Sequence, residues 1–214
     1  RPLFAQTIFQ TQGPDLWHPN PQFLFSRGAG PLLDMGPYYV TALISLFGSV
    51  DRVAAVGSKA YEQRQIHTGP DAGTTFDVEV PTTVQLLTTF ESGQQAQSLL
   101  SFDSALERHG VFEVHGTEGS IVLPDPNYFG GRIALVRPLG VLRDGMKPEQ
   151  EGVDVPQEGV EVGRGLGVLQ MVRAIAAGEP HIATGELGLH ALDVILSAEE
   201  SASSGEAVRV SSSV

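Results

Sequence analysis

Hydrophobic residues recur every three or four positions over residues 32–47, which is the spacing of one face of a helix. Gly48 follows where a terminating glycine is common, and Pro37 is compatible with a helix only near its first turn. These features predict a helix that begins close to Asp34 and ends before Gly48. The preceding residues, 1–30, are rich in proline and glycine turn signals and predict irregular structure.

From residue 50 to about residue 137, short runs alternate between hydrophobic and polar positions, as in strands with one buried face. Phe76, Val78 and Val80 form one such run, and Glu91-Ser92-Gly93 is one of the turn signals that separate the runs. Because the links are short, we expect consecutive strands to pair antiparallel. The alternation also predicts a sheet whose two faces differ chemically.

The C-terminal part returns to helical spacing. Residues 138–162 are rich in Pro, Gly and acidic residues and predict a long loop or a hairpin excursion. Helices are expected near residues 167–177 and 185–204, and a short edge strand over 207–210. The whole chain, 1–214, therefore predicts one α+β domain: a large open-faced, mainly antiparallel sheet with helices packed on one face, in two layers.

Composition and charge argue against several classes of function. The formal net charge is -12, which argues against binding to nucleic acid or to an anionic membrane surface. No apolar run approaches the length of a membrane span. Cys is absent, so neither a disulfide nor a thiolate metal site is available, and we expect a reducing, cytoplasmic location. The histidines are scattered and predict no metal site; Glu186 and His190, one turn apart, are interpreted as a helix-surface pair.

Common cofactor and nucleophile motifs are missing. A dinucleotide-binding loop needs a third glycine after Gly28-Ala29-Gly30, but the sequence has Leu33 there, and the glycines of 163–167 fail in the same way. The sequence also has no phosphate-binding Walker A loop and no G-x-S-x-G nucleophile elbow. A glycosidase-like carboxylate pair is defined by its separation in space, so the sequence leaves that alternative open.

Asp34 and Tyr38 are the strongest candidates for chemistry. Residues four positions apart lie on the same helix face, so a carboxylate and a phenol would project together near the helix start. Such a pair could orient a substrate hydroxyl and help to move its proton. The alternative is structural: Asp is common as a helix cap, and adjacent tyrosines among aliphatic residues are common in cores.

Three further residues are candidates for substrate binding. Trp17 and His18 offer an aromatic face and an imidazole, which suit the faces and hydroxyls of a sugar. Arg164 could meet an acidic substrate or a phosphate. The alternatives are that Trp17 packs a linker onto the sheet and that Arg164 is an ordinary exposed residue.

Several segments, in order along the chain, resemble one family. They are Gly28-Ala29-Gly30-Pro31-Leu32-Leu33-Asp34-Met35-Gly36-Pro37-Tyr38-Tyr39, Phe112-Glu113-Val114-His115-Gly116-Thr117-Glu118-Gly119-Ser120, Pro124-Asp125-Pro126-Asn127-Tyr128-Phe129-Gly130-Gly131 and Arg164-Gly165-Leu166-Gly167-Val168. They are similar to segments of the C-terminal domain of the Gfo/Idh/MocA (glucose-fructose oxidoreductase / inositol dehydrogenase / rhizopine catabolism) oxidoreductases. The resemblance covers essentially all 214 residues.

This resemblance implies the substrate-binding half of an oxidoreductase acting on a sugar, inositol or related polyol. In the family, a separate N-terminal Rossmann domain binds NAD or NADP, and the C-terminal sheet also makes subunit contacts, which implies a homo-oligomer through the open sheet face. Asp34 matches the family's Asp, and Tyr38 occupies the position of its His. The family's Lys, from a Glu-Lys-Pro motif, has no match in Lys59 or Lys147.

The position of the chain within its protein follows from the same features. The sequence starts at Arg1 without an initiator Met, so we expect part of a longer protein whose Rossmann domain lies elsewhere. Accordingly, no cofactor-binding residue is assigned within these 214 residues. The alternative is a non-catalytic dimerisation or ligand-binding module that has no nucleotide domain.

Overall fold

The computed structural model describes residues 1–138, 152–156 and 162–214. Its helices are α1 (Gly30–Phe47), α2 (Leu166–Ala177) and α3 (Gly185–Ser204), with short 3-10 helices η1 (Pro14–Leu16) and η2 (Pro21–Phe25). Its strands are β1 (Pro2–Gln10), β2 (Val50–Ser58), β3 (Gln63–Gln65), β4 (Thr75–Asp77), β5 (Thr83–Phe90), β6 (Gln95–Ser101), β7 (Arg108–Gly116), β8 (Gly119–Leu123), β9 (Ala134–Val136), β10 (Val153–Asp154) and β11 (Val208–Arg209).

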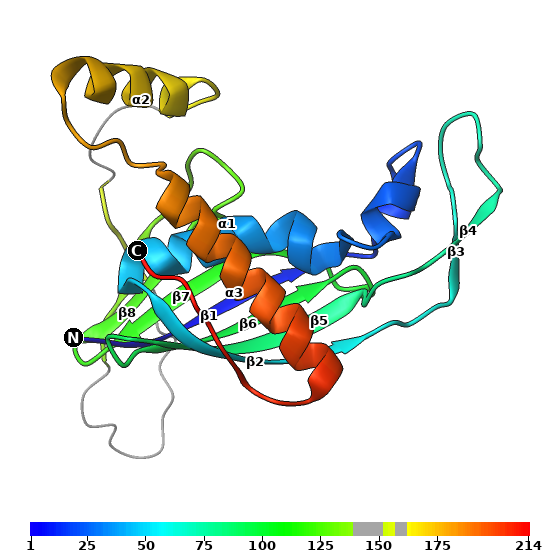
Figure 1. Cartoon of the computed structure of the whole chain (residues 1–214), viewed down its shortest axis with the longest axis horizontal. Coiled ribbons are helices and arrows are strands. Elements are labelled where there is room, and N and C mark those ends of the chain that lie inside the picture. Colours follow the sequence, from blue (N-terminus) through cyan, green and yellow to red (C-terminus); the bar gives the residue numbers. More distant parts are fainter. Residues whose placement is uncertain (139–151, 157–161) are drawn as a thin grey trace.

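Nine strands form one open sheet in the order β10-β9-β8-β7-β1-β6-β5-β2-β11, and β3 pairs with β4 in a separate two-stranded sheet. β1 pairs in parallel with β6, and the other pairings within the described residues are antiparallel. α1 and α3 cover one face of the large sheet (Figure 1). The predicted α+β class, with an open-faced and mainly antiparallel sheet, is confirmed.

The hydrophobic core lies between this sheet and α1 and α3. β5 buries every second side chain, and β6 does so over most of its length. Fully burying a side chain of this kind contributes on the order of 2 kcal/mol to folding. The most buried core residues include Tyr39 and Leu43 of α1, Val194 and Ile195 of α3, and Leu86, Phe90, Leu100 and Phe112 of the sheet.

The prediction that residues 1–30 are irregular was wrong for β1, which lies inside the sheet between β6 and β7. Its inward positions are Ala5, Thr7 and Phe9, so a small and a polar residue weaken the hydrophobic alternation. Thr7 is accommodated because its hydroxyl donates to Ser98 Oγ at 2.8 Å. Since β1 separates β6 from β7, these consecutive strands do not pair with each other, contrary to expectation.

α1 starts at Gly30, one turn before the predicted start near Asp34, and it contains Pro37. Gly30 and the proline that follows it occupy the first turn, where a missing N–H is harmless. Pro37 lies inside the helix, without an N–H to donate to the carbonyl four residues back. The predicted end is confirmed: the N–H of Gly48 donates to Ile44 O at 2.8 Å.

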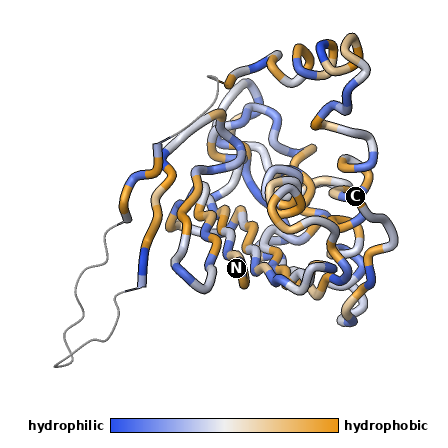
Figure 2. Tube along the Cα trace, turned by 90° about the vertical axis from the view of Figure 1, so that its left-hand side faces the viewer, coloured by the Kyte–Doolittle hydropathy of each residue, from blue (hydrophilic) through white to orange (hydrophobic). Residues whose placement is uncertain are grey.

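Both C-terminal helices and the edge strand β11 are found where they were predicted. The expected loop or hairpin over 138–162 falls largely on residues 139–151 and 157–161, outside the described residues; β10 lies within its described part. Across the three described ranges, no helix is long and apolar enough to cross a membrane. Helix α2 stands apart from the layer formed by α1 and α3, with hydrophobic turns along it (Figure 2).

His190 of α3 is fully buried, so its interpretation as a surface partner of the exposed Glu186 was wrong. Its Nε2 accepts the Val50 N–H at 2.9 Å, and its Nδ1 lies 2.9 Å from Ser212 Oγ. Burial lowers the pKa of His190, and this outweighs the opposing effects of Asp193 and Glu91. The neutral imidazole therefore ties α3, β2 and the C-terminal segment together.

We expect the free energy of unfolding to decrease as the pH falls below 6.5, the ordinary pKa of the imidazole. In that range the unfolded His190 binds a proton that the folded, buried His190 does not bind. This contribution to stability is therefore fully present above pH 6.5 and is lost as the pH falls through the lowered pKa of the folded state. Denaturant unfolding across this pH range measures it. His190→Gln can accept the Val50 N–H but cannot titrate, so it should flatten the dependence. An equal pH slope in both proteins would contradict the assignment.

Candidate functional site

The exposed side of α1 carries Asp34 and Tyr38, one helical turn apart, as the spacing predicts. Tyr38 is 44% exposed, whereas its neighbour Tyr39 is 1% exposed and belongs to the core. Asp34 lies in the second turn of the helix and does not cap it, because the N-cap position is Ala29. The two structural alternatives, a capping Asp and a core Tyr38, are therefore wrong.

Close packing explains Gly30, the last glycine of the entry to α1. Gly30 has φ +81°, and a Cβ placed on it would lie 3.0 Å from Val80 Cγ2 and 3.1 Å from Pro81 O. A larger residue would push the start of α1 away from this segment. The glycine thus sets the position of the helix, and with it the position of Asp34.

Desolvation by neighbouring protein groups raises the pKa of the Asp34 carboxyl above its usual value. Within the described residues this carboxyl has no hydrogen bond or ion pair to another side chain. A desolvated carboxylate without a hydrogen-bond partner is stabilised when a ligand hydroxyl donates a hydrogen bond to it. Its raised pKa also brings proton uptake closer to neutral pH.

Tyr39 anchors a loop beside Tyr38. Its hydroxyl donates to Asp125 Oδ1 at 3.1 Å and accepts the Gly110 N–H at 3.1 Å. Burial and the charge of Asp125 raise the pKa of Tyr39, so the hydroxyl keeps its proton. Next to Asp125 in this loop, Pro126 borders a shallow hollow of about 360 Å³ against α1. The other residues of the hollow are Pro37, Tyr38, Thr41, Ala42 and Ser45.

Trp17 and His18 lie between η1 and η2, the segment that leads into α1. Trp17 is 67% exposed, so the alternative that it packs onto the sheet was wrong. The His18 ring lies 5.5 Å from the Trp17 ring and 5.3 Å from the Phe23 ring, both edge to face. His18 Nδ1 accepts the Asn20 N–H at 3.0 Å, which leaves Nε2 as the proton-bearing nitrogen of the neutral ring. Phe23 was not predicted as part of this cluster, because the sequence marks it only by its aromatic type.

Arg164 lies exposed in the turn that leads into α2, on an element that stands apart from the body (Figure 1). The structure therefore brings Asp34 and Tyr38 together, and Trp17 and His18 together, while Arg164 belongs to a third element. Spacing along a helix predicts the first pair and chain proximity the second. No comparable signal links Arg164 to either pair.

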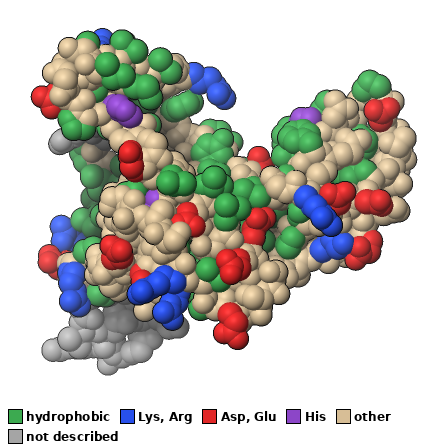
Figure 3. Space-filling view, viewed as in Figure 1, with side chains coloured by type: hydrophobic (Ala, Val, Ile, Leu, Met, Phe, Trp, Pro, Cys, Tyr) green, Lys and Arg blue, Asp and Glu red, His purple; other side chains and the backbone are tan. Residues whose placement is uncertain are grey.

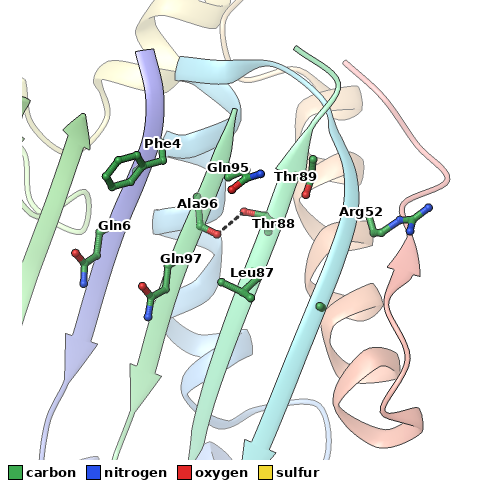
Figure 4. Close-up of a pocket in the computed structure, with 11 residues that line it drawn as sticks. Phe4, Gln6, Arg52, Leu87, Thr88, Thr89, Gln95, Ala96 and Gln97 are labelled. Carbon is green, nitrogen blue, oxygen red and sulfur yellow. Dashed lines mark hydrogen bonds between the residues drawn. The ribbon is translucent and has the colours of Figure 1, made fainter. Parts of the chain in front are cut away.

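The open face of the sheet carries a second hollow, of about 480 Å³, on the side opposite α1 and α3. Figure 4 shows Phe4, Gln6 and Gln97 projecting from β1 and β6, with Leu87 and Thr89 on β5. Leu87 is 61% exposed and Phe4 is 45% exposed. This face thus combines exposed apolar side chains with glutamine amides.

The glycine-rich nucleotide loop of a parallel βαβ unit has no counterpart among the described strands, and Val80 and Pro81 fill the space at Gly30. In ranges 1–138, 152–156 and 162–214, no three His, Asp or Glu side chains could hold a metal ion. The available chemistry is a paired carboxylate and phenol with a nearby aromatic cluster.

The fold of this chain is similar to part of several solved oxidoreductases. An NAD-binding oxidoreductase from Klebsiella pneumoniae is similar over 98% of this chain and 59% of its own, with 22% identity and a TM-score of 0.74. Levoglucosan dehydrogenase in complex with NADH and L-sorbose is similar over 99% of this chain and 60% of its own (19% identity, TM-score 0.74). Aldose-aldose oxidoreductase from Caulobacter crescentus is similar over 97% and 55% (23% identity, TM-score 0.65).

The chain belongs to the GFO/IDH/MocA C-terminal domain family, whose model matches residues 1–122. It spans about three fifths of the length of the solved structures that it resembles. No curated protein matches the sequence significantly. The family resemblance inferred from the sequence is thereby confirmed.

Proposed function

We propose that this chain is the substrate-binding half of an NAD(P)-dependent oxidoreductase acting on a sugar or a related polyol. The observation that carries the proposal is the exposed Asp34 and Tyr38 pair on α1, in a domain of this family. Asp34 and Tyr38 are the catalytic residues of this proposal. Trp17 and His18 bind the substrate, and Arg164 stays a weaker substrate-binding candidate.

In the proposed mechanism, Asp34 accepts a hydrogen bond from the substrate hydroxyl that is to be oxidised. The raised pKa of Asp34 favours uptake of the hydroxyl proton, and the Tyr38 phenol one turn away orients the hydroxyl or passes the proton on. A nicotinamide nucleotide held by a second domain would accept the hydride from the carbon that bears this hydroxyl. These 214 residues thus supply substrate orientation and proton transfer.

The substrate class rests on relatives of the same fold. One solved relative is a levoglucosan dehydrogenase bound to NADH and L-sorbose, and another is an aldose-aldose oxidoreductase with glycerol. Exposed aromatic rings at Trp17 and Phe23 and the His18 imidazole suit the apolar faces and the hydroxyls of such molecules.

A nucleotide domain would cover the helical side of the molecule. Figure 3 shows this side hollowed between α2 and the β3–β4 region, with hydrophobic side chains over α3. The exposed apolar residues include Val168, Leu169, Val172 and Ile175 on α2 and Leu189, Leu192 and Leu196 on α3. A large exposed apolar patch is typical of an interaction surface. The solved structures that resemble this chain are longer than it is, and we propose that a domain corresponding to their additional residues covers the patch.

The opposite face suits a second copy of the chain. In a twofold interface each patch meets itself, and amide groups are self-complementary because each donates and accepts. The glutamines Gln6, Gln95 and Gln97 lie side by side with Leu87 and Phe4 around the hollow of Figure 4. We propose a homo-oligomer through this face.

The proposal that a second domain binds the nucleotide, while this chain binds the substrate, can be tested directly. The 214-residue chain is expected to bind NAD or NADP only negligibly, whereas the full-length protein should bind one of them and reduce it with a sugar substrate. Calorimetric titration measures the first expectation, and absorbance of the reduced nicotinamide over a panel of sugars and polyols measures the second. Micromolar binding by the 214-residue chain would contradict the proposed division. A full-length protein that turns over no sugar or polyol would favour the non-catalytic module.

A further inference from the structure

The two-stranded β3–β4 sheet forms an arm that projects from one end of the molecule, beside η1 and η2 (Figure 1). Most of its residues are exposed, but Arg64 at the centre of β3 is 8% exposed. A buried arginine in an exposed arm requires partners that satisfy its charge and its donors. Two of those partners, Gln12 and Asp15, belong to the segment that leads into Trp17 and His18.

Arg64 joins three parts of the chain. Its Nη1 donates to Gln12 O at 2.9 Å and to Asp15 Oδ1 at 2.7 Å, on the segment that leads into Trp17. Its Nη2 donates to Phe102 O at 2.7 Å and to the Asp103 carboxylate, beyond the end of β6. The guanidinium also lies 5.1 Å from the ring centre of Phe25 in η2. Planar, multidentate contacts of this kind fix both distance and orientation.

Two further contacts join the arm to the same turn. The His67 N–H donates to Asp15 O at 3.1 Å. Gly69 also packs closely against Pro19: a Cβ placed on Gly69 would lie only 2.6 Å from Pro19 Cβ. The arm thus touches the chain both before and after Trp17 and His18.

We propose that the β3–β4 arm positions the Trp17–His18 turn, and that Arg64 is its principal positioning residue. The turn lies outside the helices and strands, and Trp17 is 67% exposed. Contacts of the arm with Asp15 and Pro19, on either side of the turn, therefore help to fix where the indole and imidazole point. The catalytic consequence rests on the proposed function, in which these two rings bind the sugar.

Trp17 is the only tryptophan of the 214 residues, so its spectra report this turn alone. Gly69→Ala should lower the fluorescence anisotropy of Trp17 and weaken its near-ultraviolet circular dichroism, because the new methyl group displaces Pro19. Gly73→Ala is the matched control. Gly73 also has positive φ, +94° against +83° for Gly69, but a Cβ there meets no atom within 4 Å. Each variant places alanine at a positive φ, so the contact with Pro19 is what distinguishes them.

Arg64→Lys is the second variant, since it keeps a buried charge beside Asp15 and Asp103 but loses the multidentate geometry. Its Trp17 signals should change as those of Gly69→Ala do, with the far-ultraviolet spectrum and cooperative unfolding retained. Wild-type Trp17 signals in both Arg64→Lys and Gly69→Ala would overturn the proposal. Equal changes in Gly69→Ala and Gly73→Ala would overturn it as well, because they would trace the effect to strain within the arm.

In the full-length protein, Gly69→Ala should raise KM for the sugar by about tenfold relative to Gly73→Ala, with kcat little changed, as expected when one ring contact of about 1.4 kcal/mol is lost. Failure of the proposed function would be seen separately. In that case Trp17→Ala would leave KM unchanged, while the spectroscopic response of Trp17 to Gly69→Ala would persist.

Discussion

Replacing Asp34 with Asn in the full-length protein is expected to lower kcat by roughly 10²- to 10⁴-fold, the usual contribution of a positioned acid or base. The amide keeps the size and the hydrogen-bonding capacity of the side chain but cannot accept the hydroxyl proton. Tyr38→Phe should lower kcat less, because it removes only the phenolic hydroxyl. Steady-state kinetics with the best sugar substrate measure both effects.

Glu186→Gln provides the matched control, since Glu186 is an exposed carboxylate in the first turn of α3. This variant should retain wild-type kcat. All three proteins should unfold at similar denaturant concentrations, because Asp34, Tyr38 and Glu186 are exposed. Unchanged turnover in both Asp34→Asn and Tyr38→Phe would show that the exposed pair has no role in proton transfer.

The pH dependence of kcat/KM should follow the same carboxyl. Asp34 must be ionised to accept a proton, and desolvation raises its pKa above the ordinary value of 3.8. Activity is therefore expected to fall on the acidic side at a pH above that value, and Asp34→Asn should remove this limb of the profile. A limb that persists in Asp34→Asn would assign it to another group.

Leu87→Arg on the open sheet face is expected to dissociate the proposed homo-oligomer. A twofold interface contains each substituted residue twice, so two charges would be buried without partners, and the dissociation constant should rise by roughly 100-fold or more. Sedimentation velocity over a range of protein concentrations measures this change. The monomer should keep its fold, because Leu87 points away from the core and is 61% exposed.

Leu106→Arg is the control for this experiment. Leu106 is 58% exposed, close to the value for Leu87, but it lies in the connection between β6 and β7. It should leave the oligomeric state unchanged. If Leu87→Arg behaves as Leu106→Arg does, the open face is not the subunit interface.

Local sequence signals predicted the elements whose patterns are strong. The helical spacing before Gly48 corresponds to α1, and the alternating runs over residues 50–137 correspond to the region of β2 to β9, because burial on one face of an element gives its sequence a periodic hydrophobicity. β1 was not predicted, because the polar Thr7 occupies an inward position. Its burial depends on a hydrogen bond to Ser98, 91 residues away. The start of α1 was misplaced because Pro37 is tolerated inside the helix.

The candidate site divides in the same way. Spacing alone predicts that Asp34 and Tyr38 share a face, since a helix brings residues i and i+4 together wherever it lies. Whether that face is exposed depends on the sheet and α3, which bury the Tyr39 side of α1. The role of Arg64 could not be predicted from local sequence, because its partners Asp15 and Asp103 are 49 and 39 residues away.

The sequence by itself determined the α+β class, the order of most elements, the family and the pairing of Asp34 with Tyr38. These are local or compositional properties, which short-range periodicity and motifs encode directly. The tertiary structure decided the insertion of β1 between β6 and β7, the exposure of Trp17 and the support of its turn by the β3–β4 arm. These depend on contacts between residues far apart in the chain, which form only when the whole core packs.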